Sequence, residues 1–147
     1  MKRFIYSLEQ VKKIRELEKE QVALELERIK QALKQTTDQI ESYQNSINDA
    51  QNKLRNKEQE SGQIQPEYRK MAKVFIAQIT ENKNAAMQIA KNLEEKYNTV
   101  QFELLKKIQA VRMLEKHQHR QQLEYEIEQI RQQHNEADDL WSTRIKA

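Results

Sequence analysis

The side chains best suited to catalysis or metal binding are few and poorly spaced in this sequence. His117 and His119 are two residues apart, so on a helix they point to different faces and cannot both bind one metal ion well. His134 stands alone, and the chain has no cysteine to supply a thiolate ligand. Asp138 and Asp139 form an acidic pair near a helix end, where solvated carboxylates are expected. The sequence therefore predicts no metal site.

Phosphate, acyl-transfer and nucleic-acid chemistry are disfavoured for similar reasons. One glycine is too few for a phosphate-binding loop, and the Ser and Thr residues have no accompanying His/Asp constellation. A DNA-binding helix concentrates positive charge on one face, whereas the basic stretches here are short and have glutamates close by. Those stretches are 2–3, 12–15 and 53–57. We expect no enzymatic activity, no cofactor and no nucleic-acid partner.

The composition predicts long helices rather than a globular core. Of 147 residues, 33% are charged and 37% are hydrophobic, with one Gly and one Pro. Such a polar chain is either disordered or helical with one narrow buried stripe, and disordered chains are usually rich in Gly and Pro. No apolar run approaches the ~20 residues that span a bilayer. Lys12, Lys13 and Arg15 follow too early for a signal peptide. We expect a cytoplasmic protein without direct membrane insertion.

The single glycine and the single proline predict one break in the helical pattern. Gly62 can adopt a positive φ and end a helix, and Pro66 fits the first turn of the next helix. The predicted single domain, 1–147, therefore has a first helix over about 7–60, a turn at 61–66 and a second helix over about 66–145. Each helix needs a partner, because isolated polar helices are marginal in water.

A heptad repeat predicts how the two helices pair. The first seam series is Val22, Leu26, Ile29, Leu33, Thr36, Ile40, Tyr43, Ile47, Ala50 and Leu54. The second is Ala72, Phe75, Ile79, Asn82, Ala86, Ala90, Leu93, Tyr97, Val100 and Leu104, with one stutter between Ala86 and Ala90. Most end-to-end pairs have residue numbers summing to 126; Tyr43–Asn82 and Ala50–Phe75 sum to 125. This constant sum predicts an all-α, antiparallel two-helix coiled-coil hairpin that reverses at Gln63.

The pattern weakens towards the N-terminus and leaves the end of the second helix unpaired. Arg15 and Glu18 fall at seam positions, so we expect looser packing there. Phe4 should face about Gln122, which leaves an overhang from about Leu123. The overhang keeps its own apolar residues at coiled-coil spacing across His134, and this suggests binding to another protein or self-association. They are Leu123, Ile127, Ile130, Ala137 and Trp141.

A second candidate surface lies near the turn, where the chain has unusually few charges. Residues 36–52 contain no basic residue, and the predicted pairing places them beside 75–90, where charge is also sparse. Depletion of charge with aromatic side chains is typical of interfaces, although these aromatics could equally fill seam positions. We call this set the turn-proximal surface: Ile40, Tyr43, Ile47, Phe75, Ile79 and Ala86.

The sequence resembles the flagellar FliJ family over most of its length. The stretch from Phe4 to Glu16, FIYSLEQVKKIRE, is similar to that family's aromatic-rich start. Residues 43–45 and 75–79 look like its turn-flanking segments, and residues 136–140, EADDL, look like its acidic C-terminal run. Gln and Asn stand in the tail where many relatives carry Glu and Arg.

The resemblance implies the role of a stalk-like part of the flagellar type III export apparatus. Its partners would be the export ATPase hexamer, a membrane protein of the export gate, and export chaperones, at the inner face of the cell membrane. The turn-proximal surface would meet the gate. The ATPase ring would meet Phe4, Leu8, Val11, Leu123, Ile127, Ile130 and Trp141. Alternatives are the equivalent stalk of a virulence secretion system or a purely structural coiled-coil tether.

Overall fold

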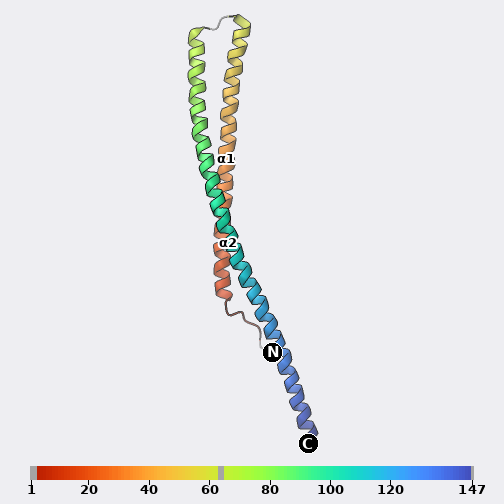
Figure 1. The fold of residues 1–147 in the computed structure, drawn as a ribbon. Helices are drawn as coiled ribbons and strands as arrows, with labels where there is room; N and C mark the ends of the chain where they lie inside the picture. Colours follow the sequence, from red (N-terminus) through yellow and green to blue (C-terminus); the bar gives the residue numbers. More distant parts are fainter. Residues whose placement is uncertain (1–2, 63–64, 147) are drawn as a thin grey trace. The chain divides into compact units, whose positions relative to one another are not determined.

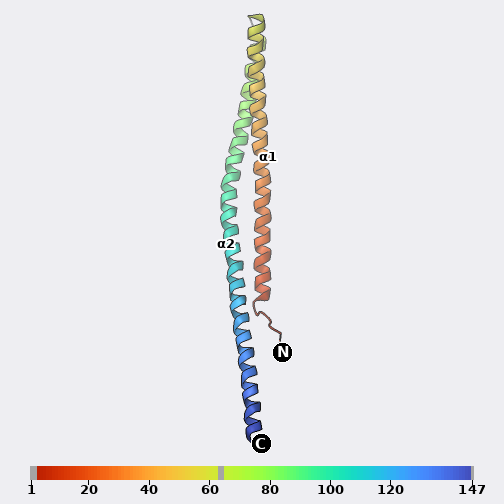
Figure 2. The ribbon, with the colours of Figure 1, turned by 90° about the vertical axis from the view of Figure 1, so that its right-hand side faces the viewer.

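The computed structural model describes residues 3–62 and 65–146, and this part of the chain is almost entirely helical. Helix α1 spans Glu9–Ser61 and helix α2 spans Pro66–Lys146. The chain divides into two compact units, one of Met1–Val22 with Glu103–Ala147 and one of Ala23–Phe102. Within each unit α1 and α2 pack against each other in opposite directions (Figure 1 and Figure 2). The predicted antiparallel helical hairpin is confirmed.

The break between the helices follows from the two residues that predicted it. Gly62 has a φ of 66°, and its N–H donates to the carbonyl of Glu58 at 3.2 Å, which satisfies an otherwise unpaired helix-end acceptor. Pro66 is the first residue of α2, where its missing N–H costs no helical bond. The first bond there runs from the Arg69 N–H to the Gln65 carbonyl, at 3.2 Å. The expected reversal point, Gln63, lies outside the described residues.

Helix α1 begins at Glu9 rather than near Ser7. Ser7 and Leu8 form a turn, and the Glu9 N–H donates to the Tyr6 carbonyl at 3.2 Å. The Lys12 N–H then donates to the Leu8 carbonyl at 2.9 Å. The carboxylate of Glu9 lies in the first helical turn, where the helix dipole favours negative charge. Residues 3–8 therefore precede α1 as a non-helical segment.

In the unit Ala23–Phe102, two positions of the predicted α2 seam are wrong. Phe75 is 48% exposed and Asn82 is exposed, whereas their neighbours Ile76 and Lys83 are half-buried. With these replacements α2 follows an unbroken repeat through Ala72, Ile76, Ile79, Lys83, Ala86, Ala90, Leu93, Tyr97 and Val100. The predicted stutter at Ala86–Ala90 is absent, and Tyr43–Lys83 and Ala50–Ile76 also sum to 126.

Continuity of the supercoil explains the difference. A stutter requires local unwinding of the pair, whereas an uninterrupted 4-3 repeat keeps one face of each helix towards the other. Lys83 suits a seam position because its aliphatic stem can lie along apolar surface while its ammonium group reaches a polar partner. That partner is Gln44, whose Oε1 accepts a hydrogen bond from Lys83 Nζ at 2.5 Å.

In the other unit, the α1 side of the seam is mostly polar. Val22 is 8% exposed and Val111 only 3%, so the helices are in close contact at Val111, where looser packing was expected. Lys12 Nζ donates to Gln118 Oε1 at 2.8 Å, and Lys107 reaches Glu18. Arg15, predicted to lie in the seam, is about half exposed. The described helices include none with a stretch apolar enough to cross a membrane.

Candidate functional site

The six residues of the turn-proximal surface differ widely in exposure. Ile47 is 7% and Ala86 5% exposed, which makes them packing residues of the seam. Ile40, Tyr43 and Ile79 are half-buried, and Phe75 at 48% offers the most surface. The Tyr43 hydroxyl accepts a hydrogen bond from Gln39 Nε2 at 3.0 Å, one turn earlier on α1. The available surface is therefore narrower than the sequence predicted.

A shallow groove runs beside the seam at Phe75. Its floor includes Ala50 and Ala72, whose small side chains leave the space between α1 and α2 unfilled. The groove has a volume of about 410 Å³, and it is lined further by Ser46, Asp49, Lys53, Tyr68, Met71 and Phe75. Met71 is 72% exposed, although no predicted surface included it. Met71 lies four residues before Phe75, a spacing that places both side chains on one face of a helix.

The apolar edge of this groove extends onto the outer face of α2. Met71, Val74, Phe75 and Gln78 follow the spacing of one helical face and line a neighbouring hollow of about 370 Å³ together with Lys70. Val74 is 54% exposed. We call Met71, Val74 and Phe75 the α2 apolar edge. Three exposed apolar side chains at consecutive positions of one face suit a partner's apolar helix better than a small polar ligand.

Polar contacts hold the two helices together between this groove and the turn. Lys57 Nζ lies 3.7 Å from the centroid of the Tyr68 ring, a cation–π arrangement across the two helices. Arg69 and Glu58 form an ion pair at 2.9 Å, although both side chains are about half exposed. Exposed pairs of this kind add little stability, typically about 0–1 kcal/mol. The Lys57–Tyr68 and Arg69–Glu58 contacts therefore join the helices at the end of the groove without contributing much to the free energy of folding.

In the other unit, the N-terminal segment before α1 packs against α2. The Phe4 and Tyr125 rings lie 5.5 Å apart between centroids, so Tyr125 has an intramolecular partner and the overhang starts later than expected. Tyr6 is only 5% exposed, and its hydroxyl lies 2.6 Å from His117 Nδ1 and 3.4 Å from the Leu114 carbonyl. If Nδ1 carries the ring proton, it donates to the hydroxyl while the hydroxyl donates to the carbonyl, and both contacts are satisfied.

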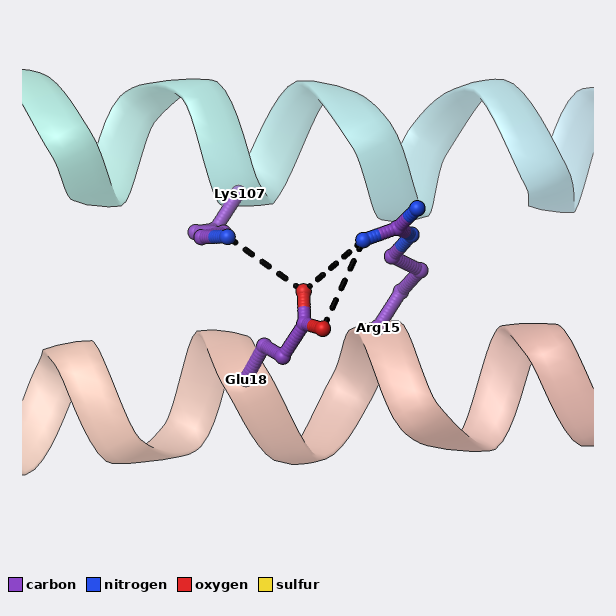
Figure 3. A network of polar contacts seen from close by, with 3 residues as sticks. All are labelled: Arg15, Glu18 and Lys107. Atoms are coloured by element: carbon purple, nitrogen blue, oxygen red, sulfur yellow. Dashed lines mark hydrogen bonds and ion pairs between the residues drawn. The ribbon is translucent and has the colours of Figure 1, made fainter.

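A three-residue charge network lies between α1 and α2 in the same unit (Figure 3). The Glu18 carboxylate is 3.0 Å from Arg15 Nη1 on its own helix and 3.3 Å from Lys107 Nζ on α2. The hydrogen bond from Arg15, followed by that from Lys107, lowers the pKa of Glu18 below its ordinary value of 4.5. Glu18 therefore serves as a bridge between the helices at a position where a coiled coil usually has an apolar residue.

The remaining candidates for the ATPase-ring surface are exposed to different degrees. Phe4 and Leu8 are half-buried against the chain itself, and Val11 is 39% exposed. On the last part of α2, Leu123 is 45%, Ile127 57%, Ile130 54% and Trp141 66% exposed. Leu140 and Ile145, which were not among the predicted interface residues, are 66% and 67% exposed. The far part of α2 is thus an apolar surface that nothing in the described chain covers.

The features described above are exposed apolar side chains, one shallow groove and polar contacts between the helices. Across residues 3–62 and 65–146, no three His, Asp or Glu side chains gather in a way that could hold a metal ion. The fold class is an all-α antiparallel coiled coil with a single-helix extension. No family model, no curated protein and no solved structure matches this chain.

Proposed function

We propose that the protein is the stalk-like accessory component of a flagellar type III export ATPase. The observation that carries this proposal is the packing of the N-terminal segment on α2, where Phe4 lies against Tyr125. The segment beginning at Phe4 bears the resemblance to the FliJ family, and the exposed end of α2 follows directly after Tyr125. A polar helix with one exposed apolar stripe, next to this segment, suits insertion into the central opening of an ATPase ring.

In this role the protein promotes assembly and activity of the ATPase hexamer and links it to the membrane export gate. The α2 apolar edge and the groove beside it are the surface we assign to the gate protein, because Met71, Val74 and Phe75 are exposed apolar side chains gathered on one helix face. Export chaperones are further partners. The protein would then be cytoplasmic and held at the inner face of the cell membrane through the export apparatus.

The ring proposal is tested by ATP hydrolysis of the cognate ATPase with and without the purified protein. We expect stimulation and more hexamer, and loss of both with Ile127→Asp combined with Ile130→Asp. The matched control combines Gln132→Asp with Asn135→Asp, which adds the same two charges to the same helix outside the apolar face. Equal stimulation by all three proteins would refute the assignment.

The gate surface is tested by two neighbouring substitutions on α2. Phe75→Ala should weaken binding to the gate protein and leave the melting temperature nearly unchanged, because Phe75 is about half exposed. Ile76→Ala should lower the free energy of unfolding by about 1–2 kcal/mol, because Ile76 occupies the seam. If Phe75→Ala binds the gate as tightly as the unmodified protein, the groove is not the gate surface.

The equivalent stalk of a virulence secretion system would present the same surfaces. The two assignments differ in which ATPase is recovered when the protein is isolated from its own cells. Recovery of a secretion ATPase outside the flagellar apparatus would favour the virulence role. A pull-down without any ATPase would contradict both.

A further inference from the structure

The apolar residues near the end of α2 lie on a different face from the seam that contacts α1. Val111, Gln118 and Tyr125 are spaced by sevens; Val111 is buried, Gln118 is bonded to Lys12, and Tyr125 packs on Phe4. Leu123 and Ile127 are each two residues from Tyr125. At about 100° per residue, they lie about 160–200° around the helix from it. The apolar face changes sides near residue 122.

The N-terminal segment therefore cannot cover this second apolar face, because it packs on the opposite side of α2. We call the face the C-terminal stripe: Leu123, Ile127, Ile130, His134, Ala137 and Trp141. All six side chains are exposed. Their spacing, four then three throughout, is that of a coiled-coil seam with Leu123, Ile130 and Ala137 at d positions and the others at a positions.

We propose that a second copy of this chain covers the C-terminal stripe, as a parallel two-stranded coiled coil over residues 123–141. This pairing goes beyond the stalk role and applies to the protein without an ATPase, because the ring and a second copy would compete for the same stripe. The stripe has Leu123 and Ile130 at d positions and Ile127 and the polar His134 at a positions. The choice of two parallel strands rests on the flanking charges, which a parallel pair sets in attractive or neutral contact. Trp141 is bulky, but Ala137 in the layer before it leaves room for the indole.

The flanking residues support this arrangement. In a parallel pair, each g residue faces the e residue five positions later on the other strand. These pairs are Glu126 with Arg131, Gln133 with Asp138, His119 with Glu124, and Leu140 with Ile145. The first is attractive, the last is apolar, and none of the four sets like charges against each other. Leu140 and Ile145, both about two-thirds exposed, would become partly buried when the two strands pair.

An antiparallel pair with the same overlap is disfavoured by charge. Aligning Leu123 of one strand with Trp141 of the other brings Arg131 against its own copy. It also sets Glu124 against Asp138, so that the pairs between e positions are repulsive in this arrangement. His134 at an a position adds specificity, since a polar residue there tends to fix register. In the single chain Arg131 lies 3.7 Å from Glu128 in an exposed pair and remains available to a second strand.

The first test is the mass of the purified full-length chain, without any ATPase, over a range of concentrations. Light scattering should show the mean mass rising from 17.7 kDa towards twice that value as concentration increases. Ile127→Asp should hold the mass at the monomer value, while Gln132→Asp should behave like the unmodified protein. A mass that stays at 17.7 kDa at every concentration would overturn the proposal.

The second test addresses the parallel arrangement through charge reversal. Glu126→Arg and Arg131→Glu should each reduce the dimer fraction, because each sets like charges across the pair. The double variant should recover it, because the attraction returns with its sign reversed. Glu128→Gln serves as the control, since it removes the contact of Arg131 within the helix and should leave dimerisation intact. A double variant no better than either single one would contradict the parallel pairing.

A third test uses the absence of cysteine in the chain. Under mild oxidation Ala137→Cys should form a disulfide-linked dimer, because d positions face each other in a parallel pair. Gln132→Cys, on the outer face, should cross-link far less. Equal cross-linking of the two variants would indicate random collision rather than this interface. The stalk proposal is tested separately by the ATPase assay. Absence of a dimer would therefore contradict the self-pairing and leave the stalk proposal standing.

Discussion

Glu18 shows how a charged residue can occupy a helix–helix contact. Its carboxylate accepts from Arg15 on α1 and is paired with Lys107 on α2, so one side chain ties the two helices together. All three side chains remain partly exposed, and water and salt screen the interaction. The contribution to stability should therefore be small but should depend on pH in a defined direction.

The pH dependence follows from the lowered pKa of Glu18. A carboxyl whose pKa is lower in the folded state adds stability above its ordinary value of 4.5, and this stability is lost as pH falls through the lowered value. Glu18→Gln should therefore melt below the unmodified protein at neutral pH, and the gap should close as pH falls below 4.5. Thermal melting across this range measures it. Glu20→Gln, which changes an exposed carboxylate on the same helix, should show no such closing gap.

Tyr6 offers a second test at the level of one atom. Tyr6→Phe keeps the buried ring and removes the hydroxyl that meets His117 and the Leu114 carbonyl. Losing a part-buried hydrogen bond should lower the free energy of unfolding by about 1 kcal/mol. Tyr97→Phe is the control, because Tyr97 is a half-buried seam residue whose hydroxyl makes no hydrogen bond among the described residues. Equal melting of the two variants would contradict the role of the hydroxyl.

At the level of the helix, Lys83 and Asn82 distinguish the observed seam from the predicted one. Lys83→Leu places an apolar side chain opposite Tyr43 and should raise the free energy of unfolding by about 1 kcal/mol. Asn82→Leu adds the same side chain at an exposed position and should have little effect. Chemical denaturation measures both. Stabilisation by Asn82→Leu alone would support the sequence-based register instead.

Much of the helix pairing could be predicted from sequence, because it depends on residue types at regular spacing. All ten predicted seam residues of α1 are buried or half-buried, and the break falls between Gly62 and Pro66 as expected. Neighbouring residues alone could not show whether Phe75 or Ile76 occupies the seam. Both are apolar and adjacent, and only an unbroken repeat through Lys83 decides between them. A lysine in a seam is a poor sequence signal.

The candidate surfaces were less predictable because exposure depends on tertiary packing. The spacing of Leu123, Ile127 and Ile130 already indicated an unpaired stripe, and these residues are exposed. The groove at Ala50 and Ala72 could not be predicted from the sequence, since it depends on small residues of two helices lining the same space. Tyr6 was missed for the same reason, because it precedes α1 and belongs to no repeat.

For the molecule as a whole, the structure implies that backbone protection is uneven. All described α2 side chains from Ile130 to Ile145 are exposed, and a single polar helix in water opens readily. Amides after about residue 130 should exchange with deuterium faster than those of residues 90–115, where α2 packs on α1. Hydrogen-exchange mass spectrometry of dilute protein measures this difference. Slow exchange at the end of α2 in dilute protein would mean that something else orders it.

Trp141 is the only tryptophan in the chain, and it is 66% exposed on the C-terminal stripe. Its indole therefore provides an intrinsic fluorescent reporter for whatever covers that stripe. Emission should be red-shifted and readily quenched by iodide when the stripe is bare. It should shift to shorter wavelength, with reduced quenching, when an apolar partner removes the ring from water. The same signal can be followed during ring assembly and during self-pairing without attaching a dye.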